Sequence, residues 1–418
     1  MFYYIGFTFY VIGIKLYNIL IIAISPFNKR AKIFTKGREK IFENIAIKLK
    51  TDTRKTIWFH VSSLGEFEQA RPVIEKLKLI YIDYKYVITV YSPSGFETRK
   101  NDKIADYIFY LPNDSKKNAE QLVDLFIPEM VFWVKYDFWF FYLNELKKRN
   151  IPTYLIAASF NNDQIYFKFY GSFLKSIIAN FTYIFTQNLK SVDLLKSIKI
   201  YNSLSVGDPR FDRVYETLVQ TEELEILNTF KGNNLLIVLG SSYALEEKML
   251  ANFLLNQMYL NIKIVVAPHF VGEERLIEIE NIFNKQTVRY SRVNANLLSN
   301  YKVLVIDNIG MLNKIYKYAN ISFIGGGFVH KGLHNILEAA VFGNAILFGN
   351  KIGYFPEATE FSNNEAAVLV ENEVDFNENL KNIIENETYR NNLGTNAKEL
   401  ILKNRGATEK IISYISKK

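Results

Sequence analysis

The chain has 418 residues, of which 49% are hydrophobic and 22% are charged, and its formal net charge is +8. A chain of this length is longer than a usual domain with one hydrophobic core, which favours two domains of about 150 to 200 residues each. The sequence has no cysteine and four histidines, which excludes disulfides and cysteine-based metal sites and argues against zinc. The positive charge favours anionic ligands or an anionic membrane surface, whereas no arginine-rich tract or zinc-finger spacing indicates nucleic acid.

The N-terminal segment 1–27 differs from the rest of the chain in composition. Residues 2–27 are almost wholly apolar and aromatic, and Lys15 and Asn18 are the interruptions. The length predicts a membrane anchor, although a lysine near the middle of a membrane span is costly. A helix lying in the interface and a buried core helix are the alternatives.

A basic stretch, NKRAKIFTKGREK, follows the apolar segment. By the positive-inside rule this flank and the chain after it stay on the cytoplasmic side of the membrane. No small-residue cleavage site follows the apolar run, so a removable signal peptide is not expected. We therefore expect the body of the protein at the cytoplasmic face of a membrane.

From residue 56 onward, short apolar runs alternate with amphipathic stretches in two successive series. The first series begins at TIWFHV and the second at NLLIVLGSS, and the polar segment 216–232 separates them. Continuous apolar strands that alternate with helices are typical of parallel sheets covered on both faces. The sequence predicts an α/β protein with two doubly wound, Rossmann-like domains facing a central cleft, at 28–215 and 233–418.

In such sheets ligands bind beyond the carboxyl ends of the strands, and three polar groups in the first series stand there. Glu66 follows TIWFHVSS at the start of a helix and could act as a general base, or could merely complement the helix dipole. Asp137 follows the strand MVFWV, with a helix N-cap as the simpler interpretation. Arg210, in VGDPRFD, could bind a carboxylate or phosphate, or could be an ordinary surface arginine.

The second series carries ligand-type groups after four of its strands. Ser241 and Ser242 precede a helix, and hydroxyls and N–H groups at a helix start suit a phosphate. Pro268 and His269 follow the next strand, where a lone histidine is more often structural. Ile309, Gly310 and Met311 form a small apolar lip that could pack against a base.

The fourth strand leads into GGGFVHKGLHNILEAA, for which we predict a glycine-rich loop that lets a ligand approach the backbone and then a helix. Within 335–338, Asn335 and Glu338 are expected on one helix face, where a carboxylate could accept hydrogen bonds from a ribose diol. Neither a Walker A loop nor a G-x-G-x-x-G fingerprint is present. Four such strand ends together indicate a nucleotide pocket, while His330 and His334 stay open between packing and ligand roles.

These motifs resemble those of the 3-deoxy-D-manno-octulosonic acid (Kdo) transferases of lipid A assembly, a membrane-anchored GT-B glycosyltransferase family. The resemblance rests on HVSSLGEFEQARPVI, YDFWFFYLNELKKRNIPTYLIAAS, VGDPRFD, LGSSYALEE and the long stretch from DNIGMLNK to AILFG. It implies CMP-Kdo as donor, the lipid A precursor (lipid IVA) as acceptor, an inner-membrane location, inversion at the anomeric carbon, and no metal or other cofactor.

The resemblance also implies roles for individual residues. Glu66 would be the general base, and Asp137 and Arg210 would stabilise the transition state. The nucleotide would be held by residues of the second domain, namely Ser241, Ser242, Pro268, His269, Ile309, Gly310, Met311, Asn335, Ile336, Leu337 and Glu338.

Three positions depart from the family pattern. Asp137 replaces the usual Glu, Arg210 a common Lys, and His269 a common Arg; the first two keep their charge, whereas the third loses a fixed positive charge. Two other functions are therefore carried forward. One is another GT-B enzyme, such as a UDP-sugar transferase or an epimerase, and the other is an inactive, membrane-associated protein that binds sugar nucleotides.

Overall fold

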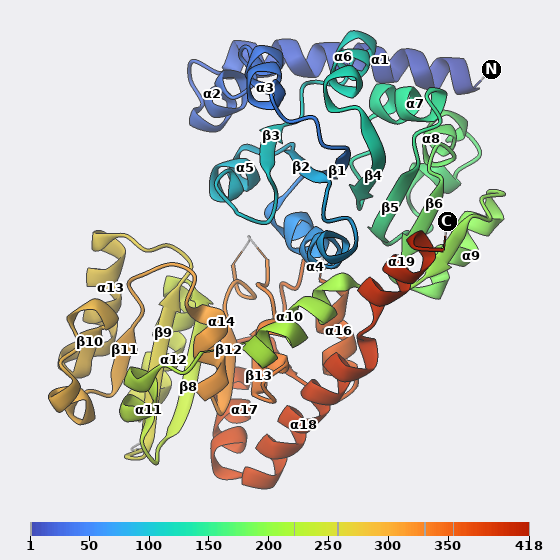
Figure 1. Cartoon of the computed structure of the whole chain (residues 1–418). Coiled ribbons are helices and arrows are strands. Elements are labelled where there is room, and N and C mark those ends of the chain that lie inside the picture. Colours follow the sequence, from blue (N-terminus) through green and yellow to red (C-terminus); the bar gives the residue numbers. More distant parts are fainter. Residues whose placement is uncertain (1, 221, 257–258, 330–331, 354, 418) are drawn as a thin grey trace. The chain divides into compact units, whose positions relative to one another are not determined.

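The structure is a computed structural model that describes residues 2–417 except 221, 257–258, 330–331 and 354 (Figure 1). It divides into two compact units: unit 1 is Met1–Arg213 with Arg405–Lys418, and unit 2 is Val214–Asn404. Each unit contains a seven-stranded sheet in which neighbouring strands are parallel. The predicted pair of doubly wound α/β domains is confirmed.

The sheet of unit 1 has the strand order β3-β2-β1-β4-β5-β6-β7. All six residues of β1 are buried, as expected for a strand covered by helices on both faces. The strand order reverses between β1 and β4, which marks the place where doubly wound sheets bind their ligands. The strands are β1 (Thr56–Val61), β2 (Lys85–Val90), β3 (Tyr107–Tyr110), β4 (Pro128–Val134), β5 (Thr153–Ala158), β6 (Tyr183–Thr186) and β7 (Ser203–Ser205).

Two hydrophobic clusters, one on each face, hold the helices of unit 1 to its sheet. The first includes α3, α6, α7 and α8, and the second includes α4 and α19; Figure 1 shows α6 and α7 on the opposite side of the sheet from α4. The helices are α1 (Phe2–Ile24), α2 (Lys29–Lys36), α3 (Ile41–Leu49), α4 (Leu64–Ile80), α5 (Pro93–Arg99), α6 (Lys116–Phe126), α7 (Phe140–Lys148), α8 (Ser172–Ile178), α9 (Leu189–Ser197), α19 (Ala407–Ile415) and the 3₁₀ turn Ile165–Phe167. Helix α10 (Pro209–Gln220) carries the chain from unit 1 into unit 2.

The C-terminal helix α19 belongs to unit 1, whereas the sequence-based boundaries keep the chain in the second domain to residue 418. Its apolar residues, among them Ile411 and Ile415, are buried in the same cluster as the core of α4. The carboxylate of Asp212 accepts hydrogen bonds from the backbone N–H groups of Gly406, at 2.6 Å, and Thr408, at 2.7 Å. The end of the chain lies in unit 1 because the apolar face of α19 is buried there against α4.

The sheet of unit 2 has the order β10-β11-β9-β8-β12-β13-β14, and its strand order reverses between β8 and β12. The strands are β8 (Leu235–Ser242), β9 (Ile262–Pro268), β10 (Thr287–Arg289), β11 (Val303–Val305), β12 (Ile321–Ile324), β13 (Ala345–Gly349) and β14 (Val368–Val370). The short edge strands β7, β10 and β14 were not predicted.

The helices of unit 2 are α11 (Glu225–Lys231), α12 (Ala244–Asn256), α13 (Glu273–Phe283), α14 (Leu312–Ile315), α15 (Leu337–Ala340), α16 (Pro356–Asn363), α17 (Glu373–Glu385) and α18 (Glu387–Asn404). Short 3₁₀ turns lie at Asn284–Gln286, Tyr290–Arg292, Ala295–Asn300 and Tyr316–Tyr318. The helix predicted to include Asn335 is wrong in extent, because α15 begins two residues later. Asn335 therefore lies in the turn before the helix and not on its face.

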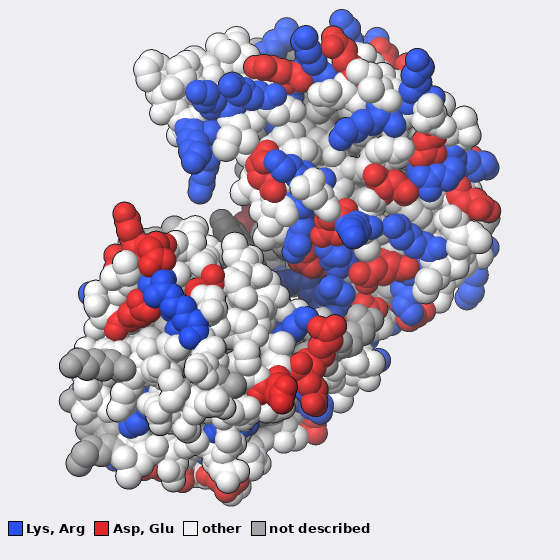
Figure 2. All heavy atoms as spheres, turned by 60° about the vertical axis from the view of Figure 1, so that its left-hand side comes forward, with Lys and Arg blue, Asp and Glu red and all other residues white. Residues whose placement is uncertain are grey.

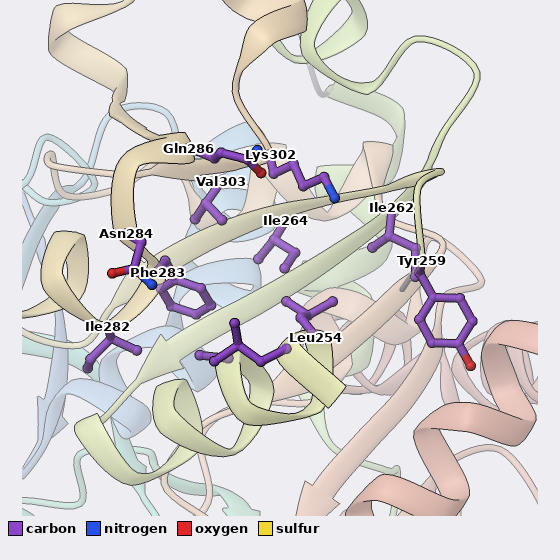
Figure 3. A pocket seen from close by; sticks show the side chains of 12 residues that line it. Leu254, Tyr259, Ile262, Ile264, Ile282, Phe283, Asn284, Gln286, Lys302 and Val303 are labelled. Atoms are coloured by element: carbon purple, nitrogen blue, oxygen red, sulfur yellow. The ribbon is translucent and has the colours of Figure 1, made fainter. Parts of the chain in front are cut away.

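An apolar cavity of about 180 Å³ lies in unit 2 between α12, α13 and the sheet (Figure 3). Its lining includes Leu254, Phe283, Ile262 and Val303. The last two begin β9 and β11, so the cavity is at the amino ends of these strands. The ligand-type residues predicted from the sequence stand at the other end of the same sheet.

Candidate functional site

In unit 1 the strand order reverses beside Glu66, which lies in the first turn of α4 and is only 8% exposed. Its Oε2 atom accepts hydrogen bonds from the backbone N–H of Ser62, at 2.5 Å, and from the Ser62 hydroxyl, at 2.7 Å. Burial raises the pKa of Glu66 above its ordinary value, although the bonds from Ser62 and the charge of Lys135 oppose the rise. The carboxylate is thus held in one orientation and has a greater affinity for a proton than an exposed glutamate.

Asp137 follows β4, the strand beside β1 at the same reversal. It is not the helix N-cap, because that position is taken by Trp139. Burial, and then the negative charge of Glu66, raise the pKa of Asp137 to about 7, against an opposing contribution from Ser62. Its Oδ2 atom is buried and has no hydrogen-bond partner within the described part of the chain, which leaves an orphaned polar atom beside Glu66.

Arg210 is paired with a buried carboxylate at the start of α10. Its Nε and a terminal nitrogen donate to Asp208 Oδ2, at 3.0 and 2.7 Å, and Gln69 and Gln187 also donate to Asp208. Burial alone would raise the pKa of Asp208, but Arg210 more than offsets it and holds this pKa below its ordinary value. Arg210 is therefore not an ordinary surface arginine, since its guanidinium is oriented by a fixed carboxylate.

Lys135 and Tyr136, which were not predicted from the sequence, interact electrostatically with both Glu66 and Asp208. Lys135 has the left-handed backbone angle φ +61° directly after β4, and its charge lowers the pKa values of both Glu66 and Asp208. Burial raises the pKa of Tyr136, which is also influenced by the charges of Glu66, Asp208 and Arg210. The structure therefore brings Glu66, Asp137 and Arg210 into one neighbourhood, and the strained Lys135 is a signal that appears only in the backbone angles.

The strand ends of unit 2 are joined by a group of stacked rings, Tyr243, His269 and His334. The ring centres of His269 and His334 are 4.5 Å apart, and Tyr243 stacks on His269 at 5.3 Å. The Tyr243 hydroxyl lies 3.3 Å from His334 Nε2. Burial, and then His269, lower the pKa of His334 to about 4, so its ring is neutral at physiological pH. These residues follow β8, β9 and β12; β8 and β12 flank the reversal, and β9 lies next to β8.

The adjacent turn fixes Asn335 and Glu338 against each other. Asn335 Nδ2 donates to Glu338 Oε1 at 3.0 Å, and Asn335 Oδ1 accepts from the backbone N–H of Leu337 at 3.1 Å. The Glu338 charge also acts on Tyr316, a fully buried tyrosine whose pKa is raised first by burial. Tyr316 in turn packs against Gly240, where an added Cβ would lie 1.9 Å from its hydroxyl, so Glu338 is linked to the end of β8.

The glycines after β12 lie against the backbone of neighbouring strand ends, whereas the sequence analysis predicted that they leave room for a ligand. An added Cβ would lie 2.2 Å from the carbonyl oxygen of Ser241 at Gly325, and 2.5 Å from the backbone nitrogen of Gly349 at Gly327. Gly326 has φ +91° and donates its N–H to the buried Glu246 at 2.6 Å. These glycines let neighbouring strand ends approach one another, and the sequence analysis had assigned that space to a ligand.

The other predicted donor-site residues differ in what they expose. The Ser242 hydroxyl donates to the buried Glu247 at 2.6 Å, while Ser241, with φ +54°, is partly exposed. Pro268, Ile336 and Leu337 are buried, so a ligand would meet their backbone and not their side chains. Met311 is partly exposed, and Gly310, with φ +91°, forms an open turn after the 89% exposed Ile309.

Across the described residues, no group of three or more His, Asp or Glu side chains is arranged to hold a metal ion.

Comparison with known proteins agrees with the resemblance drawn from the motifs. Residues 36–213 match the family described as 3-deoxy-D-manno-octulosonic-acid transferase (kdotransferase). The chain is a relative of the Kdo transferases. It is 27% identical over 383 residues to the 3-deoxy-D-manno-octulosonic acid transferase of Rickettsia felis, covering 87% of this chain and 81% of the relative. For the enzyme of the same description from Haemophilus influenzae the identity is 24% over 374 residues, covering 86% of each chain.

Comparison with solved structures shows that this chain has the GT-B fold. A UDP-GlcNAc 2-epimerase from Neisseria meningitidis, bound to UDP-GlcNAc, superposes with a TM-score of 0.61 at 18% identity, covering 87% of this chain and all of the other. A glycosyltransferase from Rickettsia africae superposes with a TM-score of 0.55 at 13% identity, covering 87% and 98%. These similarities establish the fold, and the family match and the curated relatives show that the chain is similar to Kdo transferases.

Proposed function

We propose that the protein transfers Kdo from CMP-Kdo to a hydroxyl group of the lipid A precursor, with inversion at the anomeric carbon and with Glu66 as general base. The observation that carries this proposal is the buried Glu66, held by Ser62 at the reversal of the sheet in unit 1. This carboxylate lies within the segment that matches the Kdo transferase family.

The proposed chemistry uses the two oxygens of Glu66 differently. Both bonds from Ser62 go to Oε2, so Oε1 would take the proton from the acceptor hydroxyl. As that proton leaves, the hydroxyl oxygen forms a bond to the anomeric carbon of Kdo, and the bond from this carbon to the phosphate oxygen breaks, releasing CMP. The raised pKa of Glu66 suits this role, because a base is most effective when its pKa is close to the working pH.

Asp137 and Arg210 would support this transfer without exchanging the proton themselves. With a pKa of about 7, Asp137 is about half protonated at neutral pH, and its protonated form can donate a hydrogen bond from Oδ2, which has no partner within the described residues. Arg210, oriented by Asp208, would supply fixed positive charge for an anionic sugar or phosphate. We propose that fixed protein charges of this kind, and no divalent metal, stabilise the developing negative charge.

In unit 2 the proposed donor site is built from the strand ends β8, β9, β11 and β12. Glu338, positioned by Asn335, would accept hydrogen bonds from the ribose hydroxyls, and the phosphate would lie near Ser241. The backbone at Pro268 and the lip Ile309 to Met311 would contact the cytosine, beside the stacked rings of His269 and Tyr243.

The acceptor is proposed to be a membrane lipid because unit 1 carries α1, a helix of 23 residues that is long and apolar enough to cross a membrane; an 18-residue window of it has a mean hydropathy of 2.0. The adjoining basic stretch favours an inner-membrane position with the catalytic units on the cytoplasmic face. This assignment concerns the location of the reaction and is independent of the chemistry at Glu66.

The donor is tested by turnover of the purified full-length protein with CMP-Kdo and, separately, with UDP-N-acetylglucosamine, in detergent with the lipid A precursor present. We expect release of CMP that depends on the acceptor and no release or epimerisation with the UDP-sugar. Turnover of the UDP-sugar alone would replace the proposal with the alternative GT-B activity, and turnover of neither donor would favour an inactive binding protein.

A further inference from the structure

Helix α1 has one face that lies against unit 1 along most of its length. Its partly buried residues recur every three or four positions, which places them on one side of a helix. These residues include Phe7, Tyr10, Val11, Ile14, Asn18 and Ile21. A docked stripe of this kind is typical of a helix lying on a protein surface, and it is not expected for a helix surrounded by lipid.

Ring contacts hold this face at both ends. Tyr3 contacts Phe173 of α8, with ring centres 5.6 Å apart, and Tyr17 contacts Phe34 of α2 at 6.2 Å. Between them, Phe7 contacts Phe140 of α7 at 5.3 Å. At 1.5 Å per residue, the docked length from the first to the last contact is about 21 Å, a large part of the hydrocarbon thickness of a bilayer.

The docking also includes a close approach and a buried polar link. An added Cβ at Gly6 would lie 2.7 Å from Cβ of Phe173, so the helix can approach α8 this closely only with glycine there. The Tyr10 hydroxyl donates to Asp114 Oδ2 at 2.6 Å and accepts from the backbone N–H of Phe140 at 3.0 Å. Undocking α1 would leave the buried Asp114 carboxyl and this N–H without those partners, which is costly.

The opposite face of α1 is apolar and exposed. Phe9, Ile12 and Leu16 lie on it at helical spacing and are 72%, 48% and 53% exposed. The apolar surface continues onto the loop before α8, where Phe169 is 83% exposed, and a groove of about 410 Å³ lined by residues of both segments lies between them. A continuous exposed apolar surface of this kind marks an interaction site.

Basic residues border the apolar face at its C-terminal end. Residues 1–50 contain nine Lys and Arg and two Glu, so they hold a net charge of +7 out of the +8 of the whole chain. In α2, Lys29, Lys32 and Lys36 line a shallow hollow. Figure 2 shows Lys and Arg side chains beside uncharged surface on unit 1, in the upper part of the picture. Anionic lipid headgroups are the partner that matches both the charge and the apolar face.

We propose that α1 lies in the plane of an anionic membrane surface as a docked part of unit 1, with its outward face in the outer part of one leaflet and α2 on the headgroups. This rests on the proposed membrane location and deepens it. A spanning α1 would need hydrocarbon around its whole circumference over about 30 Å, but α7, α8 and α2 occupy one side of it. Lys15, at the border of the two faces, can reach the headgroups from an in-plane helix, whereas it would be costly at the centre of a span.

The absence of native cysteine makes a depth measurement straightforward. Single cysteines are placed in the full-length protein at outward positions (Ile5→Cys, Ile12→Cys, Leu16→Cys) and, as matched controls, at docked positions (Val11→Cys, Ile14→Cys). Each is spin-labelled and bound to vesicles of phosphatidylethanolamine and phosphatidylglycerol. We expect all outward labels at one shallow depth, about 5 to 10 Å below the phosphates, and the docked labels shielded from lipid.

A depth that changes steadily along the helix, with residue 12 deepest and docked positions as lipid-exposed as outward ones, would overturn the in-plane arrangement and leave the membrane location standing. No binding to these vesicles would overturn both. A cysteine pair, Tyr3→Cys with Phe173→Cys, provides a second readout: cross-linking in vesicles is expected for docked α1, and its failure alongside efficient cross-linking in detergent contradicts the proposal.

Discussion

The Oε2 atom of Glu66 accepts both the backbone N–H and the hydroxyl of Ser62, at 2.5 and 2.7 Å. Two bonds from one residue fix the plane of the carboxylate and stabilise its charged form. Burial acts in the opposite direction and is the larger effect, so the pKa of Glu66 remains above its ordinary value. The proposed base thus has a raised affinity for a proton, while Ser62 holds its carboxylate in one orientation.

Ser62→Ala should move the acidic limb of the pH profile of kcat/KM to higher pH by about one unit, because a hydrogen bond to a charged group is worth about 1.5 to 3 kcal/mol and one pKa unit about 1.36 kcal/mol. Activity needs Glu66 ionised, and losing a bond to the charged form raises its pKa further. Ser63→Ala, which removes a weaker 3.4 Å contact to the Glu66 backbone, is the control. An acidic limb that stays in place in Ser62→Ala would argue against Glu66 as the group it reports.

Asp137→Asn should remove a fall in kcat that the natural protein shows as pH rises through about 7. The pKa of Asp137 is raised to about 7, so its carboxyl is neutral below that pH and charged above it. Asparagine stays neutral and can still donate a hydrogen bond, whereas Asp137→Ala cannot, so alanine should lose more turnover than asparagine. If asparagine and alanine are equally inactive, Asp137 acts as an anion and the proposed neutral role is wrong.

Glu338→Ala should weaken CMP binding by about tenfold to a hundredfold, as expected for one or two lost hydrogen bonds to a charged acceptor. Isothermal titration with CMP measures this directly without any acceptor. Glu378→Ala, at an exposed position in the same unit, is the matched control and should bind CMP normally. Unchanged affinity in Glu338→Ala would remove the ribose role from this residue.

Tyr10→Phe should lower thermal stability more at pH 8 than at pH 5. Burial raises the pKa of Asp114 to about 6, and the bond from Tyr10 opposes that rise. A carboxyl group whose pKa is raised in the folded protein lowers the free energy of unfolding as the pH rises through that pKa. The hydrogen bond from Tyr10 stabilises the charged form of Asp114, so its loss costs most where Asp114 is charged, by about 1 to 3 kcal/mol. Tyr4→Phe, at a 73% exposed position, should have no such effect; equal losses at both pH values would mean that Tyr10 does not stabilise the charged form of Asp114.

The sequence was sufficient for the architecture because its central strands are long, apolar and regularly spaced. It was also sufficient to name Glu66 as a candidate, since a carboxylate shortly after a buried strand is visible in the residues. It did not show Lys135, whose relevant property is a left-handed backbone angle, or Asp208, whose role depends on Gln69 and Gln187 from distant parts of the chain. Such groups depend on tertiary contacts that no local pattern encodes.

The glycine run after β12 and the end of the chain show the same limit. Gly325 and Gly327 looked like room for a ligand, but their small size is required by neighbouring backbone. The C-terminal helix α19 has a clear apolar pattern, but nothing in that pattern tells which unit provides its partner. The choice follows from the bonds of Asp212 to Gly406 and Thr408.

The most direct test of the central claim is the mass of the lipid product after the full-length protein is incubated with CMP-Kdo and tetraacylated lipid A precursor. The proposed function predicts that the acceptor gains the mass of one or more Kdo residues, and that Glu66→Gln binds CMP normally but forms this product slower by orders of magnitude. An acceptor of unchanged mass with the natural protein, or undiminished product with Glu66→Gln, would contradict the account.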